Sequence, residues 1–180
     1  MESSSAALPE GDILYFAYGS CLNHASLSAS LDLDVAPRFL GPAGLAGYRL
    51  SFSYASVTEA VCFATILPEA GARTEGGLFR LPTAVLPALD RREGVGSGRY
   101  ARMPVTVETA TGPQAALTYH GLVTLPFEAR PSDRYRALFE LGLRDCRLPE
   151  PWCRTILGHL DSLPHRDDLP TMQTLHRSSR

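Results

Sequence analysis

Hydrophobic residues follow one pattern before about residue 130 and another after it. The first part contains short apolar or alternating runs bounded by Gly, Pro or polar residues, which is typical of β-strands. These runs are rich in β-branched and aromatic residues. They predict strands at 13–18, 48–54, 61–67, 77–81, 100–109 and 115–123.

Helical patterns occur between some of these strands and again after them. A short Ser- and Ala-rich helix is expected at 22–31, and another at 83–92, where Pro87 restricts the start and Gly94 marks the end. After Ser132, an expected N-cap, apolar residues recur at helical spacing, and the pattern repeats over 149–163. The sequence therefore predicts an α+β fold, a small, largely antiparallel sheet or barrel with helices packed around it.

The 180 residues suit one domain. Residues 1–11 are small and polar and are expected to form a disordered lead. The domain itself is expected over 12–163. From residue 164 to residue 180 the chain is charged, polar and aperiodic, which predicts a polar C-terminal tail.

Composition removes several classes of function. A net charge of -2 gives no reason to expect nucleic acid or an anionic membrane as partner, and no segment is apolar for long enough to cross a bilayer. All 17 basic residues are arginine, which excludes Schiff-base chemistry and the lysine-dependent phosphate loop. The four cysteines form no C-x-x-C pair and the five histidines are scattered, so we expect a reduced, cytoplasmic protein without a metal.

The first candidate site is the run Tyr15-Phe16-Ala17-Tyr18-Gly19-Ser20. It reads as a buried strand that ends in a tight turn, which leaves backbone N–H groups beyond the strand unpaired by the sheet. Such groups, aimed at one point, bind a carboxylate or a developing oxyanion. The alternative is a strand that simply stops at a turn.

The second candidate is Glu93, a lone carboxylate at the expected end of a helix and before a loop with three glycines. A helix C-terminus disfavours an ionised carboxylate and so raises its pKa, and partial burial would act in the same direction. Arg91 and Arg92 would oppose this if they point the same way. A raised pKa suits a residue that accepts and returns a proton near neutral pH, whereas the alternative is a solvated glutamate.

Together these segments resemble the γ-glutamyl cyclotransferase family. Residues 15–22 read Y-F-A-Y-G-S-C-L, where the family signature is Y-F-A-Y-G-S-N-L. Leu89-Asp90, Glu93-Gly94-Val95, Ser97-Gly98 and Tyr100 are similar to the segment around the family's catalytic glutamate. Pro131-Ser132, Tyr135, Gly142 and Leu148-Pro149 are similar to the family helix that carries a substrate-contacting tyrosine.

The resemblance implies a small β-barrel flanked by helices and a reaction without metal or cofactor. The family cyclises a γ-glutamyl amide to 5-oxoproline and releases an amine or amino acid. The resemblance places the general acid–base at Glu93. It places substrate binding at Tyr15, Phe16, Ala17, Tyr18, Gly19, Ser20, Cys21, Leu22, Tyr100 and Tyr135. The expected partner is thus a small γ-glutamyl compound, and the oligomeric state stays open.

Cys21 is the main departure from the family, because it replaces an asparagine amide with a weakly hydrogen-bonding thiol. It suggests a rival enzyme, a thiol hydrolase with His24 or His120 as base, although a small buried thiol is the commoner role. A second rival is a module of the same fold that binds a γ-glutamyl or carboxylate ligand without turning it over.

Overall fold

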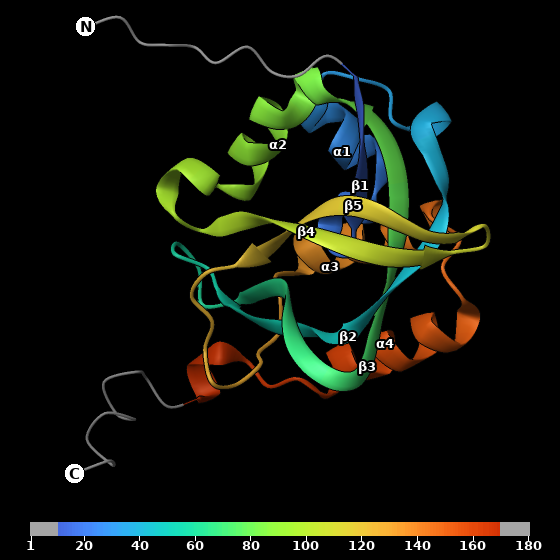
Figure 1. The fold of residues 1–180 in the computed structure, drawn as a ribbon. Coiled ribbons are helices and arrows are strands. Elements are labelled where there is room, and N and C mark those ends of the chain that lie inside the picture. Colours follow the sequence, from blue (N-terminus) through green and yellow to red (C-terminus); the bar gives the residue numbers. More distant parts are fainter. Residues whose placement is uncertain (1–10, 170–180) are drawn as a thin grey trace, which may run out of the picture.

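Five strands close into a barrel in the computed structural model, which describes residues 11–169 (Figure 1). Around the barrel the strands follow the order β1-β3-β2-β4-β5. Neighbouring strands are antiparallel, except that β1 and β5 are parallel where the barrel closes. The bounds are β1 Asp12–Ala17, β2 Phe39–Ala55, β3 Cys62–Pro82, β4 Tyr100–Thr109 and β5 Gly112–Gly121. The predicted fold class is confirmed.

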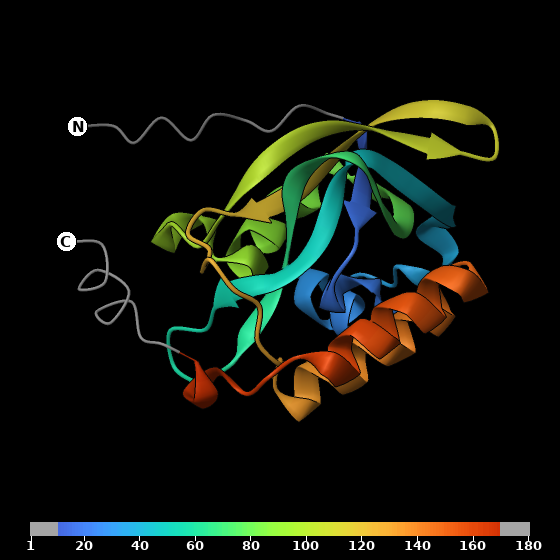
Figure 2. The same cartoon turned by 90° about the horizontal axis from the view of Figure 1, so that it is seen from below.

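The helices are α1 His24–Leu31, α2 Leu86–Glu93, α3 Asp133–Asp145 and α4 Glu150–Ser162. Short 3-10 turns lie between the longer elements: η1 Ser20–Leu22, η2 Ala36–Arg38, η3 Thr83–Val85, η4 Val95–Ser97 and η5 Arg166–Asp168. Figure 2 shows α3 and α4 side by side along one side of the barrel, where an ion pair joins Arg136 to Asp161. The Ser132 hydroxyl accepts a hydrogen bond from the Tyr135 N–H, which confirms the predicted N-cap of α3.

Two strands are longer than the sequence pattern predicts. The strand expected at 48–54 is the second part of β2, and those expected at 61–67 and 77–81 are two ends of the single strand β3. β2 and β3 pair along most of their length, with register shifts that let the long hairpin bend around the barrel. The bend brings the end of β2 and the start of β3 to the same end of the barrel as Tyr18 and Tyr100.

The core holds the site's supporting elements in place. Phe16, Phe52, Phe79 and Phe139 are all 0 % exposed. Phe52 of β2 meets Phe139 of α3 edge to face at 5.9 Å between ring centroids, which fixes α3 on the barrel. Burial of each such ring contributes about 1.5–3 kcal/mol relative to an exposed one.

The predicted terminal segments lie largely outside the described residues. This applies to 1–10 of the expected lead and 170–180 of the expected tail. The first residues of that tail contact the domain, because Arg166 donates hydrogen bonds to backbone oxygens of the loop that follows β2. Within residues 11–169, no helix is long and apolar enough to cross a membrane.

Candidate active site

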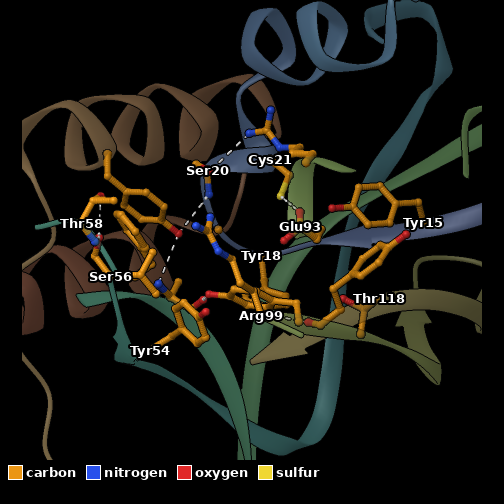
Figure 3. Close-up of a pocket in the computed structure, with 18 residues that line it drawn as sticks. Tyr15, Tyr18, Ser20, Cys21, Tyr54, Ser56, Thr58, Glu93, Arg99 and Thr118 are labelled. Atoms are coloured by element: carbon orange, nitrogen blue, oxygen red, sulfur yellow. Dashed lines mark hydrogen bonds between the residues drawn. The ribbon is translucent and has the colours of Figure 1, made fainter. Parts of the chain in front are cut away.

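A pocket of about 370 Å³ opens at one end of the barrel, where the two candidate segments meet (Figure 3). Its size lies at the small end of ligand sites, which run from roughly 300 to 1,000 Å³. Most of the residues expected at the site line it: Tyr15, Tyr18, Gly19, Ser20, Cys21, Glu93, Tyr100 and Tyr135.

Three expected binding residues lie elsewhere. Phe16 and Leu22 are fully buried in the core, and Ala17 faces Gly77 across the β1–β3 ladder. Along a strand, successive side chains point to opposite faces, which directs Phe16 away from the pocket that its neighbour Tyr15 lines. Phe16, Ala17 and Leu22 instead anchor the segment 15–22, whose other residues line the pocket.

Glu93 reaches the pocket because it is the last residue of α2. Gly94 then turns the chain with a φ of +68°, a left-handed conformation that glycine adopts without strain. The Glu93 carboxylate accepts a hydrogen bond from the Cys21 thiol, with 3.4 Å between Sγ and Oε1. Burial raises the pKa of Glu93, while the Arg92 charge and the thiol hydrogen bond oppose the rise. Burial is therefore the main cause, rather than the helix C-terminus stressed by the sequence interpretation.

The Tyr135 hydroxyl lies beside the Gly19-Ser20 turn that follows β1, where a backbone N–H group points toward it. Its oxygen accepts hydrogen bonds from the N–H groups of Ser20 and Ala64, both at 3.4 Å. Phe63 supports the ring, with 5.0 Å between centroids. In the part of the chain that the structure describes, the proton of this hydroxyl has no acceptor. Tyr135 thus receives two backbone donors and can pass a hydrogen bond on into the pocket.

Two other tyrosines of the pocket are tied to the barrel by their hydroxyl groups. Tyr18 donates to the Tyr119 carbonyl at 2.6 Å, and Tyr100 donates to the Ala64 carbonyl at 2.8 Å. Burial raises the pKa of Tyr18, Tyr100 and Tyr135 above the ordinary phenol value of 10.0. These hydroxyl groups therefore stay protonated and neutral near neutral pH.

Arg92 links α2 to the turn after β1. Its guanidinium donates to the hydroxyl groups of Ser20, Ser26 and Ser30 and to the Ser26 carbonyl, at 2.5–3.3 Å. The partners are neutral oxygens, so the positive charge remains available to act on nearby Glu93. In the sequence Arg92 stands out only as a charge near Glu93, and no local signal marks its link to α1, because α1 and α2 are about 60 residues apart.

The far wall of the pocket was not foreseen. Ser56, Val57 and Thr58 follow β2, and Tyr54 precedes them with its ring 4.6 Å from that of Tyr100. No local motif marks these positions, since only closure of the barrel brings them opposite Glu93. Arg92, Arg99, Phe63, Ala64, Thr118 and Tyr119 also line the pocket outside the expected binding set.

The geometry argues against a thiol nucleophile. Burial and the neighbouring Glu93 raise the pKa of Cys21 to about 11, so the thiol is protonated near neutral pH. The His24 imidazole lies 3.7 Å from the Cys146 sulfur and packs against Phe39 and Phe79, and His120 is not among the lining residues. Within the described part of the chain, Cys21 therefore has no histidine base, and its partner is Glu93.

Among residues 11–169, no group of three or more His, Cys, Asp or Glu side chains is arranged to hold a metal ion. The pocket instead combines one carboxyl group, several neutral hydroxyl donors and two arginines. Such a set can move a proton and stabilise negative charge on a bound molecule.

Comparison with known proteins points to one family. Residues 73–156 match the AIG2-like family. The chain is 30% identical to the γ-glutamylcyclotransferase of Bos taurus over 141 residues, which cover 76% of this chain and 72% of the bovine protein. It is 33% identical to YkqA of Bacillus subtilis over 157 residues, 84% of this chain, and this match spans only 53% of YkqA.

Solved structures agree with these matches. The structure of YkqA superposes with a TM-score of 0.79 at 32% identity, covering 86% of this chain and 56% of that one. A γ-glutamyl cyclotransferase structure gives 0.74 at 26% identity, with 86% and 90% covered. The bovine relative and the shared barrel place this chain in the γ-glutamylcyclotransferase family, as the motifs around Tyr15 and Glu93 predict.

Proposed function

We propose that the protein cyclises a γ-glutamyl amide to 5-oxoproline and releases the attached amine, with Glu93 as general base and then general acid. The observation that carries this proposal is the position of Glu93, whose carboxyl group lies in the same pocket as the Gly19-Ser20 turn and the Tyr135 hydroxyl. A proton carrier opposite hydrogen-bond donors is the arrangement that this reaction needs.

The reaction begins with the substrate's own α-amine. The Glu93 carboxylate removes a proton from the α-ammonium, and the freed nitrogen attacks the γ-carbonyl carbon within the same molecule. Well-oriented ring closure of this kind supplies roughly 7–11 kcal/mol through effective molarity. The protein therefore needs to hold the folded-back conformer and to manage the charges.

Collapse of the tetrahedral intermediate completes the reaction. The protonated Glu93 gives its proton to the leaving nitrogen, and the bond from the γ-carbon to that nitrogen breaks. The ring nitrogen gives up its second proton through the Glu93 carboxylate to the released amine, which departs as an ammonium, and the carbonyl forms again as the lactam of 5-oxoproline. The Tyr135 hydroxyl, already accepting from Ser20 and Ala64, is the donor for the developing oxyanion. Its two backbone donors polarise the O–H group and strengthen that hydrogen bond.

The test is direct. Purified protein is incubated with a panel of γ-glutamyl amides, and mass spectrometry follows 5-oxoproline and the released amine together. Equal amounts of both products support cyclisation. Glutamate in place of 5-oxoproline would mean hydrolysis, and a ligand that raises the melting temperature without product would support the binding module.

Replacement of Cys21 separates the carboxylate mechanism from a thiol mechanism. We expect Cys21→Ala to keep turnover within about tenfold, because it removes one weak hydrogen bond. Since the thiol hydrogen bond lowers the pKa of Glu93, its loss should move the acidic limb of the kcat/KM profile to higher pH. Cys21→Asn, which restores the family residue, is the matched comparison. Complete loss of turnover in Cys21→Ala would contradict the Glu93 mechanism.

We expect Arg166 to keep the loop at 56–61, which forms the far wall of the pocket, in one conformation. Its guanidinium donates to the carbonyl groups of Ser56, Glu59 and Val61 at 3.0–3.3 Å, so it holds both ends of the loop that lines the pocket. Loss of charged hydrogen bonds worth about 1.5–3 kcal/mol in Arg166→Ala should speed amide hydrogen exchange across this loop and raise KM roughly tenfold.

Arg154→Ala is the control for Arg166→Ala, because Arg154 is exposed on α4 and pairs with the exposed Glu150. This control should leave both exchange and KM unchanged. Unchanged exchange over residues 56–61 in Arg166→Ala would refute the proposed role of this arginine.

A further inference from the structure

Arg99 is a second cation in the pocket, and it differs from Arg92 in having no partner. Arg92 is occupied by three serines, whereas the Arg99 guanidinium makes no hydrogen bond or ion pair with any residue in 11–169. Figure 3 shows the Arg99 side chain directed into the pocket. An unpaired guanidinium that lines a cavity is suited to a planar anion, above all a carboxylate.

The backbone of Arg99 is fixed although its head is free. Its N–H donates to the Gly94 carbonyl at 3.1 Å, and its carbonyl accepts from the Leu122 N–H at 3.0 Å. The aliphatic stem lies over Gly94, where an added Cβ would come within 2.6 Å of Arg99 Cδ. Gly94, which turns the chain after Glu93, therefore also makes room for this stem. The turn thus fixes the position of Arg99 relative to Glu93.

The charge balance of the pocket favours an anionic ligand. Among the described lining residues, Glu93 is the one acidic side chain, and the Cys21 thiol already donates to it. Every γ-glutamyl amide carries an α-carboxylate. When the attached amine is an amino acid, a second carboxylate lies on the part that leaves. Arg99 can complement either one.

The position of Arg99 selects between the two carboxylates. Glu93 must contact the α-amine and the scissile nitrogen, so the glutamyl unit belongs beside the Gly19-Ser20 turn. Arg99 and Val57 are exposed residues of the lining, Val57 at 67%, so they mark the side of the pocket that is open to solvent. The leaving group must depart through this open side.

We propose that Arg99 binds the carboxylate of the departing amino acid and thereby selects γ-glutamyl amino acids over γ-glutamyl amines. This assignment rests on the proposed function for the meaning of the two halves of the substrate. Arg99 then determines substrate specificity, and Glu93 transfers the protons.

Binding of a matched pair of ligands tests the assignment without turnover. γ-Glutamylalanine and γ-glutamylethylamide differ by the carboxylate of the leaving group alone. Calorimetry on Glu93→Gln and on Glu93→Gln/Arg99→Gln gives the Kd of each ligand. We expect Arg99→Gln to weaken γ-glutamylalanine roughly tenfold to a hundredfold and γ-glutamylethylamide by less than about twofold. Arg99→Lys, which keeps the charge but loses the planar fork, should restore part of the affinity.

Each other outcome overturns the assignment. Equal weakening of both ligands would place the glutamyl α-carboxylate at Arg99, and no weakening of either would remove Arg99 from binding. Wild-type assays for 5-oxoproline run separately, so failure of the proposed function is recognised independently. Selective weakening without wild-type turnover would sustain Arg99 as a carboxylate-binding residue of a binding protein.

Discussion

Glu93→Gln is expected to lower kcat/KM for a γ-glutamyl amide by roughly 10²–10⁴-fold, the usual contribution of a positioned acid–base group. Glutamine keeps the size of the side chain and can still meet the Cys21 thiol, so the pocket should keep its shape. It cannot take a proton from the α-ammonium. Substrate binding should therefore survive while the chemical step fails, which single-turnover and calorimetric measurements separate.

The pH dependence of the wild type gives a second readout of Glu93. The proposed mechanism begins with the ionised carboxylate, so kcat/KM should rise with pH as Glu93 loses its proton. Because burial raises the pKa of Glu93, this limb should lie above the ordinary carboxyl value of 4.5. In Glu93→Gln the remaining activity should lack that limb.

As pH rises and Glu93 ionises, the stability of the folded protein should fall while the activity rises. The folded protein holds the Glu93 proton more tightly than the unfolded chain does, so the free energy of unfolding decreases as pH rises from about 4.5 through the raised pKa. Glu93→Gln removes this loss. The variant should be at least as stable as wild type at pH 8, and its advantage should shrink toward pH 4 in urea unfolding.

Glu150→Gln is the matched control, since Glu150 is an exposed glutamate at the start of α4, away from the pocket. It should leave kcat/KM and its pH profile unchanged. Wild-type kcat/KM in Glu93→Gln would refute the acid–base role. A large loss of stability in Glu93→Gln at pH 8 would show that any fall in activity reflects misfolding.

Local signals in the sequence predicted several of the elements that line the pocket. The strand expected at 100–109 has the bounds of β4, and Ser132 and Gly94 mark helix ends as expected. In each case the signal is a short-range one, an alternating run, a capping hydroxyl or a glycine stop. Such signals need no knowledge of the rest of the fold.

The long β2–β3 hairpin was harder to predict because its bends resemble turns. Gly41, Gly47 and Gly71 have φ values of +137°, +80° and +80°, and two of them lie at register shifts of β2. Glycine and proline there break the alternating pattern, although the strands continue through bulges. A strand that bends around a barrel therefore looks like two strands separated by a loop.

Some residues of the candidate site could likewise be predicted from local motifs, and others could not. Glu93 and the Gly19-Ser20 turn belong to motifs, so the sequence could assign them roles. The wall at 56–58 and the clamp by Arg166 depend on segments about 110 residues apart that only the closed barrel brings together. Arg99 lies inside a motif, yet its free guanidinium could be recognised only when its neighbours were known.

Gly142→Ala is expected to combine a loss of stability with a loss of activity. Gly142 faces the turn that carries Ser20 and Cys21, and an added Cβ would lie 2.5 Å from Leu22 Cβ and 2.6 Å from the Asn23 backbone nitrogen. Alanine gains about 1 kcal/mol of helix propensity. Overpacking against backbone costs about 1–3 kcal/mol. The larger cost should win, lowering the free energy of unfolding by up to about 2 kcal/mol.

The loss of activity follows from what α3 holds. One turn after Gly142, the Asp145 carboxylate accepts hydrogen bonds from the Asn23 amide and the His24 N–H, both at 2.9 Å. Displacement of α3 would thus shift the start of α1 and the Gly19-Ser20 turn before it, which lines the pocket. A shift of about 1 Å in a positioning element can cost roughly 10²-fold in rate.

Gly158→Ala isolates the effect of packing from that of helix propensity. Gly158 is an exposed residue within α4, and an added Cβ there would meet nothing within 4 Å. This variant should gain up to about 1 kcal/mol of stability at unchanged kcat/KM. Urea unfolding and steady-state kinetics on both variants decide the matter, because equal stability of Gly142→Ala and Gly158→Ala would mean that α3 does not press on the turn.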